Sequence, residues 1–560
     1  IVIKRAMPRQ NESVNEIWMC DKGRFTYHYT EGTEEYPRLT QPLVRRAGKL
    51  SPASWEDALE VTAQRFKAAG EGLMVLGSGR LANEDLANLK ELTQLTGAQA
   101  ALYSTQAGGE LVAQVGLGKG TNLGELKAGS AILVVASDLE EEAPIWWLRV
   151  KQAAERGASL IVVNPRATKL DRYASHILRY TYGNEAVTIL GLVNALSAKR
   201  PELPGKVPLT PELKAAAEAF AHAENAMVVF GSEGLGLAGS QALAQACANL
   251  LISTNHVGKV NNGLLAVWQR ANDQGAWEIG WRPQPDLGAA LQSAKALYIV
   301  AADPAGDNPA LAADLQAARE NGAFVVVQEL FLTETGQLAD VVLPAQAYTE
   351  RDGTFTSGER RVQRFYPAVL PKQGTRPDFE ITGQIGKQMG LDVETSSAAR
   401  VMLRLAQRLP AFAELGSSPY RKLAETQDQW PMVGRSDMYY GGTTYDNKQG
   451  LGVQLTPLAQ QGKLPSLTWP KEVAFPAAGT TGLVAVPVTV LYDRGQTVLP
   501  TKMLQSRIPE LFIVLNPNDA VRFKLEAGSM AEVSLGGKEF QAQVRLDSSL
   551  PEGCLLLPRS

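Results

Sequence analysis

The chain has 560 residues, of which 45% are hydrophobic and 20% are charged, and its 55 basic and 58 acidic side chains leave a formal net charge of −3. This composition is typical of a folded globular protein, and the length predicts roughly three or four domains. The nearly balanced charge, without a cluster of Lys and Arg, argues against a nucleic-acid partner. The longest apolar run, residues 482–492, contains Pro487 and is too short to cross a bilayer, so we expect no direct membrane span.

The sequence begins at Ile1 without the apolar core of a signal peptide, and we expect the chain to be a fragment of a longer protein. Its three cysteines, Cys20, Cys247 and Cys554, lie far apart along the chain. This spacing argues against a disulfide scaffold and fits a reducing, cytoplasmic setting.

Six short runs are apolar at every position, and each precedes a segment with helical periodicity. Such runs are buried on both faces, which is typical of parallel strands in an α/β sheet. They begin near Leu73, Ala131, Ser159, Ala226, Ala296 and Ala323. Between them, Ser54 is placed to cap a helix that Gly70 ends, and Pro144 opens another that Gly157 ends. The alternation predicts doubly wound α/β domains.

The last third of the chain has a different residue pattern. From about residue 395 to 480 the periodicity gives way to Gly, Pro, Ser and Tyr, with 438–450 as the most polar section, and we expect a long connector over 401–483. Segment 530–547 then alternates apolar and polar residues on both sides of Gly536-Gly537, which predicts a β-hairpin. The C-terminal domain should therefore be a small β-rich barrel.

Small or polar residues follow several of the predicted strands. They are Gly77-Ser-Gly79, Ser137-Asp138, Asn164-Pro-Arg166, Gly231-Ser-Glu-Gly234 and Asp303-Pro304. Open α/β sheets bind ligands outside the carboxyl ends of their strands, although the same residues also make tight βα turns. No strand is followed by a complete G-x-G-x-x-G, residues 231–239 being the nearest approach, and the four histidines form no zinc or hydrolase motif.

Four segments occur in the order found in the molybdopterin oxidoreductase superfamily, which the chain resembles over most of its length. They are "VNEIWMCDKGRF" (14–25), "GASLIVVNPRATKLDRYA" (157–174), "QRANDQGAWEIG" (269–280) and "LFLTETGQLADVVLPAQAYTERDGTFTSGERRVQ" (330–363). Within the superfamily, the first segment looks most like the large iron–sulfur subunit of respiratory complex I, the NADH-quinone oxidoreductase.

The resemblance implies an α/β fold with two interleaved doubly wound (Rossmann-like) domains of formate dehydrogenase type and a C-terminal β-barrel of double-psi type. The implied domains are a remnant of an iron–sulfur domain of the 4Fe-4S Mo/W bis-MGD type at 1–44, a first α/β domain at 45–105 plus 292–400, an inserted second α/β domain at 106–291, the connector at 401–483 and the barrel at 484–560.

The family motif gives Cys20 and Lys22 implied roles. A [4Fe–4S] cluster requires four thiolates, and in the family three of them come from a C-x2-C-x3-C run upstream of the Cys-x-Lys-Gly-Arg motif. Cys20 matches the fourth ligand, if the upstream cysteines exist, and Lys22 matches a lysine that lies between cluster and pterin. Many sequences of this complex I subunit lack the cluster, so the alternative is that Cys20 is a relic buried beside Trp18 and Phe25.

The chain departs from the family pattern where a pterin would bind. Active relatives place a Cys, selenocysteine or Ser metal ligand in the loop matched by residues 101–110, which offers only Ser104. The expected Gly-x-Asn-Pro is "ASDLEEEAP", and Asn164 replaces the acid often seen before Pro-Arg. The three acids Glu140–Glu142 would repel a pyrophosphate that faced them.

Several family positions are nevertheless retained. Arg166 and Thr168, with Lys22, match vestigial pterin-site positions. For these and the other retained residues we expect structural work, with arginines pairing with carboxylates and glycines making turns. The others are Asn272, Gly275, Glu350 and Arg361.

The resemblance therefore implies a cofactor-free scaffold within an NADH:quinone oxidoreductase (translocase), with no catalytic residue of its own. Iron–sulfur clusters ([4Fe–4S] and [2Fe–2S]) would belong to the complete subunit, and molybdopterin is not expected. The implied partners are other peripheral-arm subunits of complex I, with NADH and quinone reached through the whole complex, on the cytoplasmic side of the bacterial inner membrane. The alternative is an active molybdenum or tungsten bis-pterin oxidoreductase such as a formate dehydrogenase alpha subunit. A third possibility, an unrelated NAD-binding protein, is disfavoured by segment 330–363.

Overall fold

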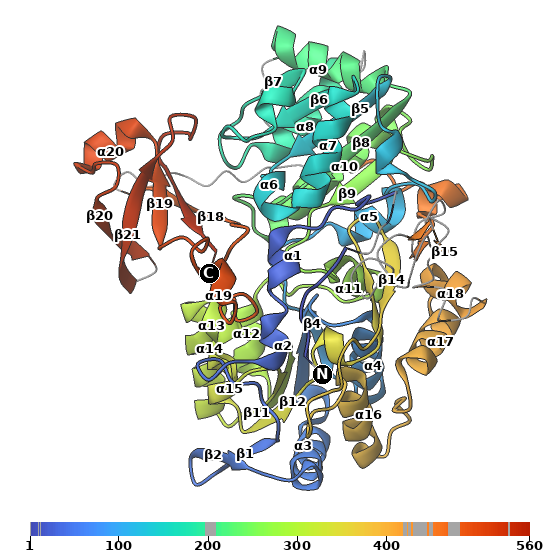
Figure 1. Ribbon diagram of the computed structural model, residues 1–560, viewed down its shortest axis with the longest axis vertical. Coiled ribbons are helices and arrows are strands. Elements are labelled where there is room, and N and C mark those ends of the chain that lie inside the picture. Colours follow the sequence, from blue (N-terminus) through green and yellow to red (C-terminus); the bar gives the residue numbers. More distant parts are fainter. Residues whose placement is uncertain are drawn as a thin grey trace.

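Two α/β bodies and a separate C-terminal sheet make up the computed structural model of the protein (Figure 1). The first body lies at the bottom of the view, the second at the top, and the C-terminal sheet, in red, lies to one side. The structure describes residues 2–8, 11, 13–196, 209–417, 420, 423, 427–428, 445–446, 452–468, 482–535 and 538–559.

The first body is built on a seven-stranded sheet of order β2-β1-β12-β11-β10-β3-β4. All neighbours from β12 to β4 run parallel, while β1 pairs antiparallel with β12 and β2. The strands are β1 (Leu43–Arg46), β2 (Lys49–Pro52), β3 (Leu73–Gly77), β4 (Gln99–Leu102), β10 (Ala296–Val300), β11 (Phe324–Glu329) and β12 (Val341–Pro344). They come from two separate stretches of the chain, which fits an interleaved topology.

All strands of the second body come from the intervening stretch and run parallel, in the order β7-β6-β5-β8-β9. They are β5 (Ser130–Val135), β6 (Ser159–Val163), β7 (His176–Leu178), β8 (Asn225–Phe230) and β9 (Gly263–Ala266). The doubly wound sheets expected from the six apolar runs, and the interleaving that the resemblance implies, are thereby confirmed. The predicted residue limits of the domains stay a prediction.

Helices cover both faces of each sheet (Figure 1). Along β3, Leu73 and Val75 pack in one core and Met74 and Leu76 in another, which explains why every position of the run is apolar. The helices of the first body are α3 (Trp55–Ala69), α4 (Asn83–Thr96), α11 (Asp273–Ile279), α12 (Leu287–Ser293), α13 (Pro304–Asp307), α14 (Pro309–Glu320), α15 (Glu334–Leu338) and α16 (Asp378–Met389). Those associated with the second are α5 (Gly109–Val115), α6 (Leu139–Glu142), α7 (Pro144–Glu155), α8 (Glu185–Leu196), α9 (Pro211–Ala221) and α10 (Leu237–Ser253).

The predicted helix ends agree with the structure. The Ser54 side chain accepts a hydrogen bond from the Asp57 amide at 3.0 Å and caps α3, and Gly70 ends that helix with a φ of 55°. Pro144 occupies the first turn of α7, where its missing N–H costs nothing.

The connector expected over 401–483 is wrong in its first part, because helix α17 (Ala398–Arg408) occupies it and α18 (Ala413–Ser417) follows. α17 buries Val401, Met402 and Leu405 and packs on α4. These apolar positions follow helical spacing between the arginines, which is a signal of an amphipathic helix that the prediction overlooked. The polar section 438–450 lies outside the described residues, except for β16 (Tyr445–Asp446), which pairs with β15 (Gln427–Asp428).

The β-rich C-terminal domain is a five-stranded mixed sheet of order β18-β22-β19-β21-β20. Its strands are β18 (Val484–Val488), β19 (Phe512–Leu515), β20 (Met530–Leu535), β21 (Lys538–Leu546) and β22 (Cys554–Pro558), with helices α19 (Lys502–Gln505) and α20 (Pro517–Phe523). Antiparallel pairing of β20 with β21 confirms the predicted hairpin, although Gly536-Gly537 lies outside the described residues.

Three smaller pieces complete the fold. Near the N-terminus are the short helices α1 (Asp21–Phe25) and α2 (His28–Glu31), and a small antiparallel sheet joins β13 (Gly353–Thr356), β14 (Arg361–Phe365) and β17 (Val453–Gln454). No helix among the described residues is long and apolar enough to cross a membrane.

A buried group of carboxyl and hydroxyl side chains fixes the start of α4. The Glu84 carboxylate accepts hydrogen bonds from the Thr354 amide at 2.8 Å and the Tyr420 hydroxyl at 2.7 Å. Beside it, Arg351 forms an ion pair with Asp85 at 2.8 Å. Burial nevertheless raises the pKa of Glu84 to about 7, because these hydrogen bonds offset only part of the cost of a charge in the interior.

The raised pKa of Glu84 predicts a stability that depends on pH. Between pH 4.5 and 7 the folded protein keeps a proton that the unfolded chain releases, so stability should fall as pH rises through this window, by roughly 1–2 kcal/mol between pH 5 and 7. Glu84→Gln mimics the protonated carboxyl and should make the slope shallower by the Glu84 contribution, whereas the exposed Glu56→Gln should leave it unchanged. Scanning calorimetry from pH 5 to 7 measures this, and equal slopes for Glu84→Gln and the parent protein would refute it.

Candidate functional site

The carboxyl ends of the parallel strands in the second sheet bring three charged residues together. Asp138 follows β5, Arg166 follows β6 and Glu233 follows β8, and these three strands are neighbours in the sheet. All three residues lie in strand-end segments that the sequence singled out as a ligand edge, namely 137–138, 164–166 and 231–234. The structure therefore places the predicted segments side by side.

Arg166 is held by carboxylates on two sides. Its Nε and Nη2 atoms donate to the two oxygens of Glu233 at 2.9 and 2.7 Å, and Nη2 also contacts Asp138 at 3.2 Å. The Tyr182 hydroxyl donates to Glu233 at 2.8 Å. The Arg166 and Glu233 side chains are only 13% and 6% exposed. This two-point contact occupies the Nε–Nη2 edge of the guanidinium group, which is the edge that a phosphate would bind in the same way.

Three further acidic side chains at the same edge, Glu140 to Glu142, also form hydrogen bonds or ion pairs with other groups of this chain. Burial raises the pKa of Glu142 to about 8, a shift that the nearby Glu233 carboxylate strengthens and the hydrogen bond from Ser137 opposes. Glu141 accepts a hydrogen bond at 2.8 Å from the Leu491 amide, and Glu140 forms an ion pair with Lys169 at 2.7 Å. The predicted acidic segment thus faces side chains and backbone of this chain.

The first sheet repeats the arrangement at its own carboxyl edge. Arg80, just after β3, forms an ion pair with Glu329 at the end of β11 at 2.5 Å. At the end of β10, Asp303 accepts hydrogen bonds from the Thr335 amide and hydroxyl at 2.9 and 2.7 Å. In each sheet, therefore, an arginine at one strand end is neutralised by a glutamate from the strand two places away.

The loop matched to the metal-binding loop of active relatives is closed on itself. Ser104 exchanges hydrogen bonds of 3.3 Å with the backbone carbonyl and amide of Gln106. Gln106 is fully buried, and within the described part of the chain neither atom of its side-chain amide has a hydrogen-bond partner. Such an orphaned amide is costly, and a ligand or a water molecule would satisfy it.

Cys20 lies at the start of α1 and Lys22 lies within that helix. The half-buried Cys20 caps the helix, its Sγ accepting a hydrogen bond from the Gly23 amide at 3.5 Å. The expected burial of Cys20 beside Trp18 is wrong, because Cys20 is half-buried and Trp18 is 51% exposed, whereas the role of Cys20 as a cluster ligand stays a prediction. Lys22 forms an ion pair of 2.5 Å with Asp493 of the C-terminal domain, and each side chain is 28% exposed.

Thr168 has a local role in its turn, where its amide and hydroxyl donate to Asp171 at 3.3 Å. The other retained family positions also make internal contacts. Asn272 donates to the Leu81 carbonyl, and Gly275 leaves no room for a Cβ beside Asn272. Glu350 forms an ion pair with Arg38, and Arg361 with Glu359.

Sequence reasoning missed Arg80, Glu329 and Asp493. Arg80 and Glu329 stand within three residues of a strand end, which is a usable signal once neighbouring strands are known. Strand order cannot be read from the local sequence, however. Asp493 is 471 residues from Lys22 and carries no local signal at all.

The strand-end residues do not fit a pterin dinucleotide on the second sheet. A diphosphate at this edge would lie near the carboxyl groups of Asp138 and Glu233, while the arginine between them is already neutralised. For an iron–sulfur cluster, Cys20 offers one thiolate where four are required. No group of three or more His, Cys, Asp and Glu side chains in the described ranges is placed to hold a metal ion.

Comparison with known proteins places this geometry in context. The family model "Molybdopterin oxidoreductase" matches residues 38–388, and the model "NADH-ubiquinone oxidoreductase NDSU1/NuoG-like, 4Fe-4S domain" matches residues 2–28. Acetylene hydratase from Pelobacter acetylenicus has a similar structure, with a TM-score of 0.68 over 99% of this chain and 88% of that chain at 16% sequence identity. This likeness shows the α/β fold.

Two proteins that are similar in sequence to this chain carry the names of different enzymes. F420-dependent formate dehydrogenase subunit alpha of Methanocaldococcus jannaschii is 25% identical over 98% of this chain and 90% of its own length. One subunit of the NADH-quinone oxidoreductase of Streptomyces coelicolor is 30% identical over 67% of this chain and 48% of its own length.

Loss of Arg166 should destabilise the second body strongly. Arg166→Met leaves Glu233 and Asp138 as neighbouring buried carboxylates without a cation, which should cost about 3–5 kcal/mol. The double variant Arg166→Met, Glu233→Met should recover at least half of that loss. Lys169→Met, which breaks an exposed ion pair at the same edge, should cost less than about 1 kcal/mol. Calorimetric unfolding of the parent protein and these three variants measures the losses, and a double variant no more stable than Arg166→Met would contradict the assignment.

Proposed function

Because the chain belongs to the molybdopterin oxidoreductase family, we propose a function within the electron-transfer reactions of that family. It is the pterin-type part of the large iron–sulfur subunit of an NADH-quinone oxidoreductase, and it works as a scaffold without a pterin of its own. The observation that carries this proposal is the position of Arg166 between Glu233 and Asp138. An arginine in this state cannot also receive a diphosphate without losing a buried partner.

Two further observations support the proposal. The NuoG-like 4Fe-4S model matches the N-terminal residues 2–28, which include Cys20 and Lys22. The ion pair of Lys22 with Asp493 directs this lysine to the C-terminal domain. In the proposed assembly, iron–sulfur clusters of the complete subunit carry the electrons, and the two α/β bodies provide surfaces for neighbouring subunits of the peripheral arm.

The second candidate is a molybdenum or tungsten bis-pterin oxidoreductase of formate dehydrogenase type. The comparisons favour this candidate by coverage, because the formate dehydrogenase relative matches along nearly its whole length. Gln106 favours it as well, since its buried side-chain amide, which has no hydrogen-bond partner among the described residues, lies in the loop expected to face the metal. The strand-end side chains favour the scaffold, and we rank it first on that ground.

Metal analysis of the full-length subunit from its native source separates the two candidates. The scaffold predicts molybdenum and tungsten far below one atom per chain, together with iron from clusters. If Cys20 ligates a [4Fe–4S] cluster, Cys20→Ser should lower the iron content by about four atoms per chain. The buried Cys247→Ser is the matched control and should leave it unchanged. About one molybdenum or tungsten per chain would overturn the scaffold and support the second candidate.

Replacement of Gln106 tests the same question through stability. In a chain that holds no pterin, Gln106→Leu removes two unsatisfied polar atoms and should raise the free energy of unfolding by about 1–2 kcal/mol. Gln454 is also buried, but its amide donates to the Glu359 carbonyl and accepts from Gly120, so Gln454→Leu should lower stability. A loss of stability in Gln106→Leu would indicate that the amide has a bound partner in the native protein.

A further inference from the structure

Each of the five residues of helix α1 is at least partly exposed to solvent. Hydrogen bonds of 3.0 Å run from the Arg24 amide to the Cys20 carbonyl and from the Thr26 amide to the Lys22 carbonyl. A helix this short is not stable by itself in water, because so few hydrogen bonds do not offset the entropy lost in its first turn. Contacts with the rest of the chain therefore hold α1 in place.

The C-terminal domain supplies two of these contacts. The Asp493 carboxylate lies 2.5 Å from Lys22 Nζ, and the Thr501 hydroxyl donates to the Phe25 carbonyl at 3.3 Å. Thr501 is fully buried, and α19, which follows it, packs against α1 (Figure 1). Residues of the C-terminal domain thus contact α1 near both of its ends.

The chain between Asp493 and Thr501 is a series of compact turns. The Gly495 amide donates at 2.8 Å to the Asp493 carboxylate oxygen that Lys22 does not contact. The Val498 amide donates to the Gly495 carbonyl at 2.8 Å, and the Thr501 amide donates to the Val498 carbonyl at 2.9 Å. These turns fix the spacing of the two side chains that hold α1.

The preceding residues tie the same segment to the second body. The Leu491 amide donates at 2.8 Å to the Glu141 carboxylate, which belongs to α6. Burial raises the pKa of the Tyr492 hydroxyl, and Asp21 and Cys20 raise it further, so this side chain faces the start of α1. Three consecutive residues, 491–493, therefore connect α6 to α1.

We propose that residues 491–501 act as a strap that ties α1 to the second body, so that release of the strap at either end frees α1 and opens access to Cys20. The strap continues from β18, whose Val486 and Val488 pack with Tyr182 of the second body, and seating of the C-terminal domain holds it in place. Cys20 caps α1, so its position depends on the order of that helix. The strap works in the same way under either candidate function, because its contacts join groups of this chain.

Hydrogen exchange of the Arg24 and Thr26 amides in the 560-residue chain measures the release of α1. Asp493→Asn keeps the acceptor for the Gly495 amide but removes the ion pair, and it should speed exchange about two- to fivefold, which is the range that a partly exposed ion pair supports. Lys22→Met should have a similar effect. The double variant should exchange no faster than either single variant, because both changes remove one contact. Unchanged exchange in Asp493→Asn would overturn the strap.

Glu141 tests whether the two ends of the strap are coupled. Glu141→Ala removes the anchor of the Leu491 amide and should also speed exchange of the α1 amides, at least about twofold. Its neighbour Glu140 forms an ion pair with Lys169 of the second body, so Glu140→Ala is the matched control and should leave the α1 amides unchanged. Faster exchange in Asp493→Asn without any change in Glu141→Ala would refute the coupling.

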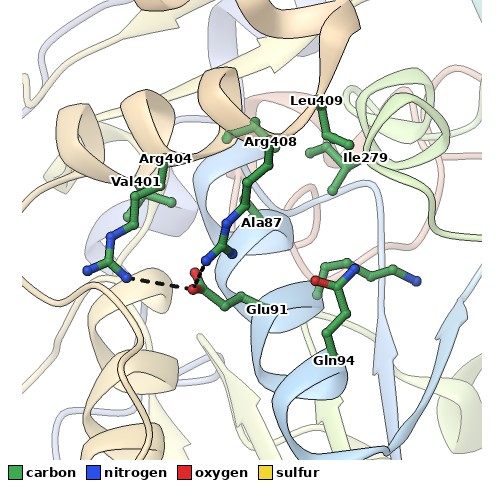
Figure 2. Close-up of a pocket in the computed structure, with 10 residues that line it drawn as sticks. Ala87, Glu91, Gln94, Ile279, Val401, Arg404, Arg408 and Leu409 are labelled. Carbon is green, nitrogen blue, oxygen red and sulfur yellow. Dashed lines mark hydrogen bonds and ion pairs between the residues drawn. The ribbon is translucent and has the colours of Figure 1, made fainter.

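An ion pair in the first body provides a second control (Figure 2). Arg408 on α17 lies 2.6 Å from Glu91 on α4, and this contact also joins two separate elements of the fold. Arg408→Gln breaks it without changing the strap and should leave exchange of the α1 amides unchanged. Equal acceleration in Arg408→Gln and Asp493→Asn would indicate a general loss of stability and would contradict the strap.

Alkylation by iodoacetamide, followed by peptide mass spectrometry, measures access to Cys20. Glu141→Ala leaves Lys22 and Asp493 in place beside the thiol and should speed alkylation of Cys20 at least about twofold. The buried Cys247 reports global unfolding and should react at the parent rate. An unchanged rate at Cys20, or the same acceleration at Cys247, would overturn the strap. Thermal unfolding of each variant establishes that it is folded.

Discussion

The buried arginines of this protein determine which of its surfaces can bind anything else. A guanidinium group keeps its charge in the interior and must therefore be neutralised by a carboxylate. Arg38 with Glu350 and Arg360 with Glu278 join segments that are distant in sequence, with side chains at most 2% exposed. At the carboxyl ends of the strands the same requirement is met by glutamates of this chain, and the anion-binding capacity of those edges is used within the fold.

Much of the architecture could be predicted because strand burial is a local property. A run such as residues 296–300 is apolar at every position only if both faces of its sheet are covered, and the helix caps at Ser54 and Pro144 depend on residues within one turn. Helix α17 was not predicted. Its arginines at 404 and 408, which contact Glu91, stand among the apolar positions and give the segment a polar composition.

The candidate site was only partly predictable, for a related reason. The sequence indicated which segments end the strands, and it marked Arg166 and the acids near it. It could not indicate that Glu233 neutralises Arg166, because that contact depends on β5, β6 and β8 being neighbours. The ion pair of Lys22 with Asp493 is even harder to predict from the sequence, since it joins two domains from opposite ends of the chain.

The C-terminal sheet gives the strand-end acids a structural role that helps to explain their number. The Leu491 amide donates to Glu141, and the Ala167 amide, next to Arg166, donates to Ser549, so backbone groups of both domains meet at this edge. Tyr182, which holds Glu233, packs in one apolar cluster with residues of β18 and β22. The acids at this edge therefore have two structural tasks, since Glu141 contacts the C-terminal domain while Glu233 and Asp138 neutralise Arg166.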